Sequence, residues 1–379
     1  MASRAPAAAT PTSFSTDEAL RLCDDLAEAG CLQCNVSGGE PLMRKDWPQL
    51  CARLASHGLK VNLVTNGTLL DEAAIETAQK HGVSAFALSF DGLQATHDRI
   101  RPHPVAGRSQ FAEVIAALER LQRVKALVAA ITHINRWNYG ELEAMHALLG
   151  EKGVARWQVQ LGMPQGRQRE IEVPYTISPE MLPELTQRLV ALIQSEKQPG
   201  LLIVDDIGYY TEVEPILRSS PDKKPAVWTG CFAGILNVGI ESNGDVKGCS
   251  GLPKEFVAGN VRERPFKELW ADESRFAYNT CWHESKLTGF CARCPYRRLC
   301  RAGCTAMAYS VTGSIYDNPY CLHRVLTQRG EALPPPAPSQ PSLGCAGGGS
   351  LVACGDPVGA APTCCSPGGA GHEDGEGSS

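Results

Sequence analysis

Apolar and polar residues alternate with two different periods along the first half of the chain. Short apolar runs typical of buried β-strands are separated by longer stretches in which apolar residues recur at helical spacing. Ser15 and Glu18 form a capping box in front of the first helical stretch. Strands are predicted at residues 31–37, 60–65, 84–90, 126–134 and 157–162, and helices at 47–56, 72–81, 111–122 and 141–149. The hydrophobic pattern therefore predicts an α/β domain.

Repeated strand–helix alternation is typical of a parallel sheet with right-handed crossovers, in either a doubly wound or a barrel-like fold. Polar and glycine residues lie at the ends of several predicted strands, as Gly38-Gly39-Glu40, Thr65-Asn66-Gly67, Ser89-Phe90-Asp91-Gly92 and His133-Ile134-Asn135. The carboxyl ends of parallel strands meet at one edge of the sheet, where both kinds of fold bind their ligands. We therefore expect a ligand site at this edge.

The composition changes along the chain and suggests domain boundaries. Residues 1–14 are rich in Ala and Pro and are expected to be disordered. Residues 15–200 hold the predicted α/β domain, whose last helix, 179–195, leads into a loop-rich, cysteine-dense domain at 201–330. Residues 333–379 form a Pro-, Gly- and Ser-rich low-complexity tail that is expected to be disordered. The tail also carries cysteines without cluster spacing, namely Cys345, Cys354, Cys364 and Cys365.

The charge and hydropathy of the chain limit the classes of partner it can bind and the compartments in which we expect it. A formal net charge of −5 gives no reason to expect nucleic acid or an anionic membrane as a partner. No run approaches the roughly 18 apolar residues that a membrane span needs. The opening residues also lack the apolar core of a secretory signal. We therefore expect a cytoplasmic protein.

The distribution of the 16 cysteines points to a metal or cluster site. None occurs between Cys51 and Cys231, whereas the second domain contains Cys291-x2-Cys294-x5-Cys300-x3-Cys304. Four thiolates in a compact loop can hold zinc or an iron–sulfur cluster, and the spacing alone does not choose between them. A disulfide set is disfavoured in a cytosolic protein.

These cysteines resemble the SPASM pattern, C-x(9–15)-G-x4-C, then C-x2-C-x5-C-x3-C, then a final C. In this chain Cys231 is followed by Gly244 after twelve residues, and Cys249 follows that glycine at the required spacing. The resemblance implies two auxiliary 4Fe-4S clusters. It assigns Cys291, Cys294, Cys300 and Cys321 to the outer cluster and Cys231, Cys249 and Cys304 to the inner one. The inner set is one ligand short, so either Cys281 is the fourth ligand or one iron is open.

The first domain resembles the radical SAM fold, here a partial (β/α)6 TIM-like barrel that binds S-adenosylmethionine. Gly38-Gly39-Glu40-Pro41 is similar to the family's GGEP motif, whose backbone and acid hold the methionine amino group. Glycines allow this close approach and an ammonium needs acceptors. By resemblance Ser89, Asp91 and Asn135 contact the ribose and the methionine carboxylate, although each could equally cap a turn.

One element of the family pattern is missing from these residues. The C-x3-C-x2-C motif that holds the catalytic cluster after the first strand is absent, and Cys31-x2-Cys34 lies in a later strand and cannot replace it. We therefore expect a barrel that lacks its first strand, either because the chain is truncated or because it is a natural pseudoenzyme. A catalytic 4Fe-4S cluster is expected only if a missing N-terminal segment exists.

Two functions follow from the resemblance. The first is a radical SAM enzyme that modifies a ribosomally made peptide or a small molecule, with an external electron donor such as flavodoxin or ferredoxin. The second is a catalytically incomplete iron–sulfur partner that binds a peptide or transfers electrons. The segment between the domains could line the substrate pocket or form a surface turn, and its candidate residues are Asp205, Asp206, Tyr209 and Tyr210.

Overall fold

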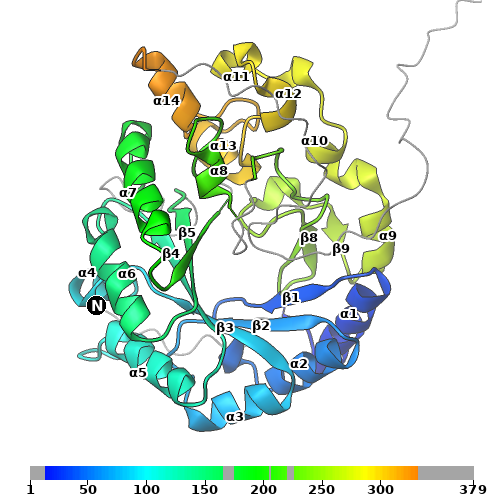
Figure 1. Ribbon diagram of the computed structural model, residues 1–379. Coiled ribbons are helices and arrows are strands. Elements are labelled where there is room, and N and C mark those ends of the chain that lie inside the picture. The colour runs from blue at the N-terminus through cyan, green and yellow to red at the C-terminus, as the bar shows by residue number, and fades with distance from the viewer. Residues whose placement is uncertain (1–12, 165–174, 205, 220–225, 332–379) are drawn as a thin grey trace, which may run out of the picture.

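The computed structural model describes residues 13–164, 175–204, 206–219 and 226–331 (Figure 1). Nearly all of the expected disordered opening, the low-complexity tail with its cysteines, and Asp205 lie outside the described residues.

Six parallel strands form the main sheet, and they lie in the order in which they occur in the sequence (Figure 1). A doubly wound sheet reverses its strand order at a switch point, whereas this sheet never does, so every crossover runs in the same direction. The predicted parallel α/β sheet is therefore confirmed, and it is of the partial-barrel kind. The strands are β1 (Gln33–Val36), β2 (Lys60–Thr65), β3 (Val83–Ser89), β4 (Val128–Ile134), β5 (Arg156–Leu161) and β6 (Gly200–Ile203).

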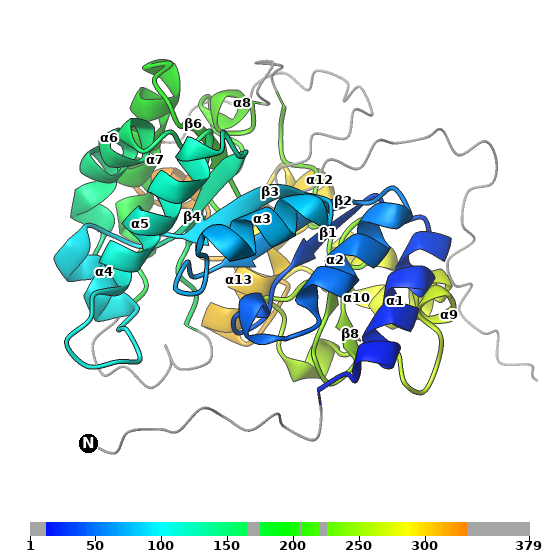
Figure 2. The ribbon, with the colours of Figure 1, turned by 90° about the horizontal axis from the view of Figure 1, so that it is seen from below.

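The helices of this domain cover one face of the sheet (Figures 1 and 2). The predicted capping box is present, since Ser15 Oγ accepts from Glu18 N and Glu18 Oε2 accepts from Ser15 N. The helices are α1 (Thr16–Glu28), α2 (Trp47–Ser56), α3 (Glu72–Lys80), α4 (Gln94–Ile100), α5 (Gln110–Arg123), α6 (Leu142–Glu151) and α7 (Leu182–Gln194). Short 3-10 turns occur at η1 (Pro41–Met43), η2 (Tyr139–Glu141) and η4 (Pro179–Met181).

Two elements of the first domain are absent from the sequence-based prediction. Strand β6 pairs with β5 from Arg156↔Gly200 to Val159↔Ile203, so the sheet extends past residue 200. Helix α4 fills part of the connection between β3 and α5. Both elements are short and carry little periodicity, and β6 is defined by its pairing with β5 rather than by a local pattern.

The two faces of the sheet differ in chemistry. Val61 and Leu63 of β2 are fully buried against the helices. Asn62 and Val64, which alternate with them, point to the opposite face and are only half-buried. On that face Asn62 Nδ2 donates to Asn35 Oδ1 of β1 at 2.9 Å. The concave side of the sheet is therefore a polar, partly accessible wall rather than a second apolar core.

The cysteine-dense region packs against the first domain through one continuous core that runs from Cys23 to Val325. An ion pair between Glu18 of α1 and Arg262, 2.8 Å apart, joins the two parts at the surface. The region contains a small antiparallel sheet of β7 (Gly239–Ile240), β8 (Asp245–Lys247) and β9 (Gly259–Asn260). Its helices are α8 (Glu214–Leu217), α9 (Phe266–Ala271), α10 (Ala277–Thr280), α11 (Gly289–Arg293), α12 (Arg297–Cys300), α13 (Thr305–Thr312) and α14 (Leu322–Gln328), with 3-10 turns at η5 (Lys254–Phe256), η6 (Glu273–Phe276) and η7 (Glu284–Lys286).

None of the described helices is long and apolar enough to cross a membrane.

Candidate functional site

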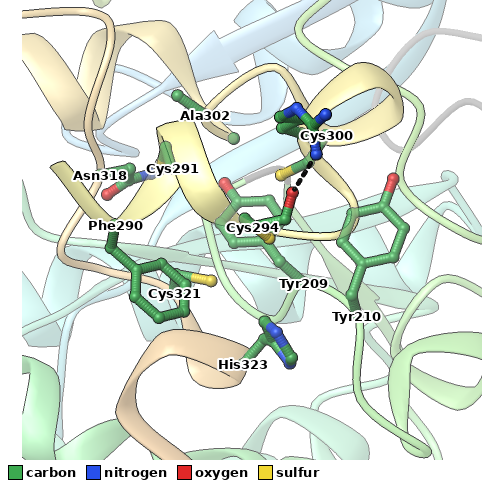
Figure 3. Close-up of a pocket in the computed structure, with 12 residues that line it drawn as sticks. Tyr209, Tyr210, Phe290, Cys291, Cys294, Cys300, Ala302, Asn318, Cys321 and His323 are labelled. Atoms are coloured by element: carbon green, nitrogen blue, oxygen red, sulfur yellow. Dashed lines mark hydrogen bonds between the residues drawn. The ribbon is translucent and has the colours of Figure 1, made fainter. Parts of the chain in front are cut away.

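The four cysteines assigned to the outer cluster line a single cavity. Cys291 belongs to α11, Cys294 follows it, Cys300 ends α12, and Cys321 caps α14. Figure 3 shows the sulfur atoms of Cys294, Cys300 and Cys321 facing the space that the labelled side chains enclose. These side chains are at most 9% exposed, and all four residues are free thiols. The fold therefore gathers sulfur donors that lie up to thirty positions apart in the sequence.

Burial governs the protonation of these thiols. It raises the pKa of Cys291 to about 11 and that of Cys321 to about 12, and it raises the pKa of Cys294 and Cys300 as well. A buried thiolate is costly without a cation, whereas bound iron would stabilise all four anionic sulfurs. Four thiols around one cavity fit an iron–sulfur cluster, which takes four cysteine ligands.

The backbone around this cavity adopts unusual conformations. Among the described residues, four of the six non-glycine positions with positive φ lie here, namely Tyr209, Tyr210, Arg301 and Ala302. Arg301, Ala302 and Gly303 are consecutive, with φ of 56°, 63° and 70°, and they form the spacer between Cys300 and Cys304. Such conformations persist only where the surroundings enforce them, and they concentrate at functional sites.

A buried ion pair holds the two strained tyrosines in place. Glu214 pairs with Arg218 at 3.1 Å, and both side chains are almost fully buried. The Glu214 carboxylate also accepts from the backbone N of Tyr209 at 2.8 Å and of Trp228 at 3.1 Å. Trp228 in turn donates from Nε1 to the carbonyl of Cys300. Tyr210 stacks on Tyr296 with ring centroids 4.4 Å apart. These contacts hold Tyr209 and Tyr210 in position on one side of the outer cavity.

The three cysteines assigned to the inner cluster are also brought together. Cys231, Cys249 and Cys304 pack around the same small apolar cluster of Ala233, Leu252 and Ala306. The pKa of the Cys304 thiol is raised first by burial and then by the charges of Cys231 and Asp206, with Cys249 contributing less.

The inner site has an acidic neighbour from the segment between the domains. Asp206 is 1% exposed, and its Oδ2 accepts from Leu161 N at the end of β5. Its charge raises the pKa of the Cys304 thiol. Cys281 follows α10 and is half-buried, with Thr280 Oγ1 4.0 Å from its sulfur. Its role as fourth ligand stays a prediction.

The GGEP motif lies at the predicted edge of the main sheet, directly after β1. Glu40 Oε1 accepts from Thr65 Oγ1 at 2.8 Å and Oε2 accepts from Asn66 N at 2.8 Å, so the acid ties η1 to the end of β2. A Cβ added to Gly38 or Gly39 would meet nothing within 4 Å. The backbone of the two glycines is therefore open to a ligand, and this arrangement fits an approaching ammonium group.

Asp91, at the end of β3, is held by the protein's own donors. Its side chain is 1% exposed, and its oxygens accept from Arg101 Nε at 2.5 Å and from His133 N at 2.8 Å. Burial alone would raise the pKa of this carboxyl, but the charges of Arg101 and His133 hold the pKa below its usual value. The backbone N of Asp91 donates to Nδ1 of His97 in α4. Asp91 thus joins β3, α4 and β4 at the ligand edge.

Asn135 and Ser89 differ in their surroundings. Asn135 is fully buried, and its Oδ1 accepts from Trp137 N while its Nδ2 donates to His133 O and Tyr175 Oη. It therefore shapes the turn after β4. Ser89 is half-buried, and no side-chain hydrogen bond is found for it in the described part of the chain, so its hydroxyl is available at the concave face.

Several residues of both sites escaped prediction from the sequence. The outer cavity is also lined by Phe290, Arg297, Asn318 and His323, and the edge of the sheet depends on Arg101. His323 stands two residues after Cys321, and that proximity was a usable signal. Arg101 lies in a connecting segment that nothing in the sequence pattern marks.

Two family models match the chain. The radical SAM superfamily model matches residues 3–149, and the SPASM model, described as an iron–sulfur cluster-binding domain, matches residues 231–295. The predicted resemblance to both families is therefore confirmed.

Known proteins of similar sequence and fold agree with this match. The AdoMet-dependent heme synthase of Methanosarcina barkeri is 31% identical over 82% of this chain and 88% of its own length. The PqqA peptide cyclase of Granulibacter bethesdensis is 28% identical, with 84% of each chain covered. Among solved structures, Streptococcus suis SuiB bound to S-adenosylmethionine superposes with a TM-score of 0.62 at 17% identity, covering 83% of this chain and 71% of that one. Native anSMEcpe with bound AdoMet gives a TM-score of 0.62 at 18% identity, over 83% and 88%. The parallel partial barrel, the sheet-edge motif and the gathered cysteines, taken with these matches, show that the chain belongs to the radical SAM superfamily and carries a SPASM iron–sulfur cluster-binding domain.

Proposed function

We propose that this chain takes part in the S-adenosylmethionine-dependent radical modification of a peptide or a small molecule. The observation that carries the proposal is the placement of an open glycine backbone at the edge of a polar concave sheet, in the same fold as a cavity lined by four buried cysteines. Bound S-adenosylmethionine would supply the radical chemistry, while the protein positions and shields the reacting groups. Gly38, Gly39 and Glu40 would hold its methionine end.

Both substrate classes have support among the relatives. PqqA peptide cyclase and mycofactocin maturase are named for peptide substrates, and SuiB has been seen with its precursor peptide SuiA. AdoMet-dependent heme synthase acts on a small molecule. The half-buried polar face of β1 and β2 offers hydrogen-bonding groups that suit either class.

We further propose two auxiliary 4Fe-4S clusters, one on Cys291, Cys294, Cys300 and Cys321 and one on Cys231, Cys249 and Cys304. Alanine at Cys294 should remove the outer cluster, because three thiolates and a gap leave one iron without a protein ligand. In anaerobically purified Cys294→Ala, iron and sulfide per chain should be lower than in the native chain by the content of one cluster. Zinc should be absent from the native chain and from the variant.

Cys281→Ala is the matched control. Unchanged iron in this variant excludes Cys281 as a ligand of the inner cluster, whereas a loss of iron identifies it as one. Zinc in place of iron, or an iron content that Cys294→Ala leaves intact, would overturn the cluster assignment.

Binding of S-adenosylmethionine tests the sheet-edge site. Because a Cβ at Gly39 would meet nothing within 4 Å, Gly39→Val should fold normally and yet fill the space that the ligand needs. Equilibrium dialysis should show saturable binding to the native chain and at least about tenfold weaker binding to the variant, a loss of roughly 1.4 kcal/mol. Gly140→Val, at another glycine with open space around it, should bind normally. Equal affinity in all three proteins would refute the site.

The second candidate function, a non-catalytic cluster-bearing partner, rests on the absence of C-x3-C-x2-C from the 379 residues. Without that motif no cluster is placed beside the sulfonium. We therefore expect the 379-residue chain to bind S-adenosylmethionine without cleaving it reductively. Detection of 5′-deoxyadenosine above background would favour the enzyme in this form.

A further inference from the structure

The charge of the chain is distributed unevenly. Between residues 281 and 331 there are seven Lys and Arg residues and three Asp and Glu residues, although the whole chain has a formal net charge of −5. The basic surplus therefore belongs to the segment that carries α11, α12 and α14, at the end of the molecule opposite α3 and α5 (Figure 1). A local surplus on an acidic protein marks a surface that attracts a partner of opposite charge.

Four basic side chains on the adjoining η7, α11 and α12 form one group, which we call the basic cap: Lys286, Arg293, Arg297 and Arg298. Arg298 has a side-chain exposure of 77%, and Lys286 and Arg293 are exposed as well. Glu284 accepts from both Arg297 and Arg298, so a single carboxylate serves two guanidinium groups. Within the described residues neither Lys286 nor Arg293 has an ion-pair partner. The cap therefore keeps a net positive charge.

The basic cap lies directly over the outer cysteine cavity. Arg293 ends α11, the helix of Cys291, and is followed at once by Cys294. Arg297 lines the cavity, and its guanidinium donates to the carbonyl of Cys294 at 3.4 Å. Arg298 lies on α12, which ends at Cys300. The basic cap is thus one helical turn or less along the chain from three of the four outer cysteines.

We propose that the basic cap is the docking surface for a small acidic electron-carrier protein, which delivers electrons to the outer cluster. This inference rests on the cluster assignment of the proposed function. In each encounter the carrier loses one electron and the outer cluster gains one, with no bond made or broken. The cap favours an electron carrier over an acidic peptide because its arginines share short helices with the cluster ligands, which brings the two redox centres together.

The test uses the full chain with both clusters in place, and the probe is reduced flavodoxin. Arg293→Glu/Arg298→Glu reverses two charges and leaves Arg297, which lines the cavity, unchanged. Stopped-flow bleaching of the cluster absorbance should be about tenfold slower or more at low ionic strength, and high salt should shrink the difference. Photoreduced deazaflavin, a small uncharged reductant, should reduce both proteins at the same rate.

A matched control reverses two exposed arginines on the first domain, Arg108→Glu/Arg123→Glu, which lie at and before α5. This control should react with flavodoxin at the native rate, and equal slowing in both double variants would show a net-charge effect and overturn the proposal. An unchanged flavodoxin rate in the cap variant would also overturn the proposal. This includes the case in which that variant loses binding of a polyglutamate peptide but keeps its flavodoxin rate. Iron content is measured in every sample, so a failure of the cluster assignment is seen separately from a failure of docking.

Discussion

At the scale of single residues, Tyr209 connects the two cysteine sets. It is fully buried with φ of 80°, and its ring lies against Gly303, where an added Cβ would stand 2.7 Å from Cζ. Its Oη accepts from the backbone N of Cys304 at 2.8 Å, while the same side chain lines the outer cavity. We infer that Tyr209 positions the peptide that separates Cys300 from Cys304.

Tyr209→Phe tests this role. The variant keeps the ring but leaves the N–H of Cys304 without its acceptor, so we expect unchanged iron content and a stability loss of about 1–2 kcal/mol. The freed N–H can reorient toward the cluster sulfurs, and hydrogen bonds to sulfur tune cluster potentials. The midpoint potential of the inner cluster, measured by EPR-monitored titration, should therefore shift.

Tyr210→Phe is the matched control for this experiment. Its hydroxyl donates to the carbonyl of Trp228 and is not the acceptor for the backbone N of Cys304. It should lose comparable stability while the inner-cluster potential stays at its native value. If both variants shift the potential equally, or neither does, Tyr209 has no specific positioning role.

At the scale of elements, strand β2 has one face buried against the helices and one half-buried face on the concave side of the sheet. Leu63→Ala removes fully buried volume beneath the helices and should lower the free energy of unfolding by about 3 kcal/mol. Val64→Ala, one residue later on the concave face, should cost less than about 1 kcal/mol, since its side chain is already half-exposed. Urea unfolding of the two variants measures the difference, and equal losses would mean that the concave face is packed as core.

The elements also differ in how far the sequence predicted them. Strands β1 to β5 and the long helices carry strong periodicity, so local pattern was enough to locate them. Strand β6 and helix α4 carry little periodicity. Strand β6 forms by pairing with the edge of β5, and helix α4 lies in the connection between β3 and α5. Short elements depend on their neighbours more than on their own residues.

At the scale of the whole molecule, the α/β domain and the cysteine-dense region share one hydrophobic core and are not independent domains joined by a linker. Tyr320 Oη donates to the carbonyl of Ile177 at 2.6 Å, and Glu18 pairs with Arg262. Residues that follow the domain boundary serve both parts, because Asp206 caps the end of β5 while Tyr209 lines the outer cavity and Trp228 donates to the carbonyl of Cys300. The two cysteine sets are therefore held by the sheet as well as by the loops that carry them.

The sequence by itself predicted the candidate ligand set, and it determined that polar and glycine residues follow the strands at one edge of the sheet. Cysteine spacing is a local property, since two or three intervening residues restrict where a thiol can point, and the GGEP turn follows its strand directly. The parallel sheet also followed from local periodicity.

Only the tertiary structure decided what surrounds those groups. Tyr209 meets Cys304 across 95 positions, and Asp91 meets His133 across 42. Such contacts depend on how the strands order and curve, which no local pattern encodes. The same holds for the basic cap, whose arginines become one surface because α11 and α12 fold around a common cavity.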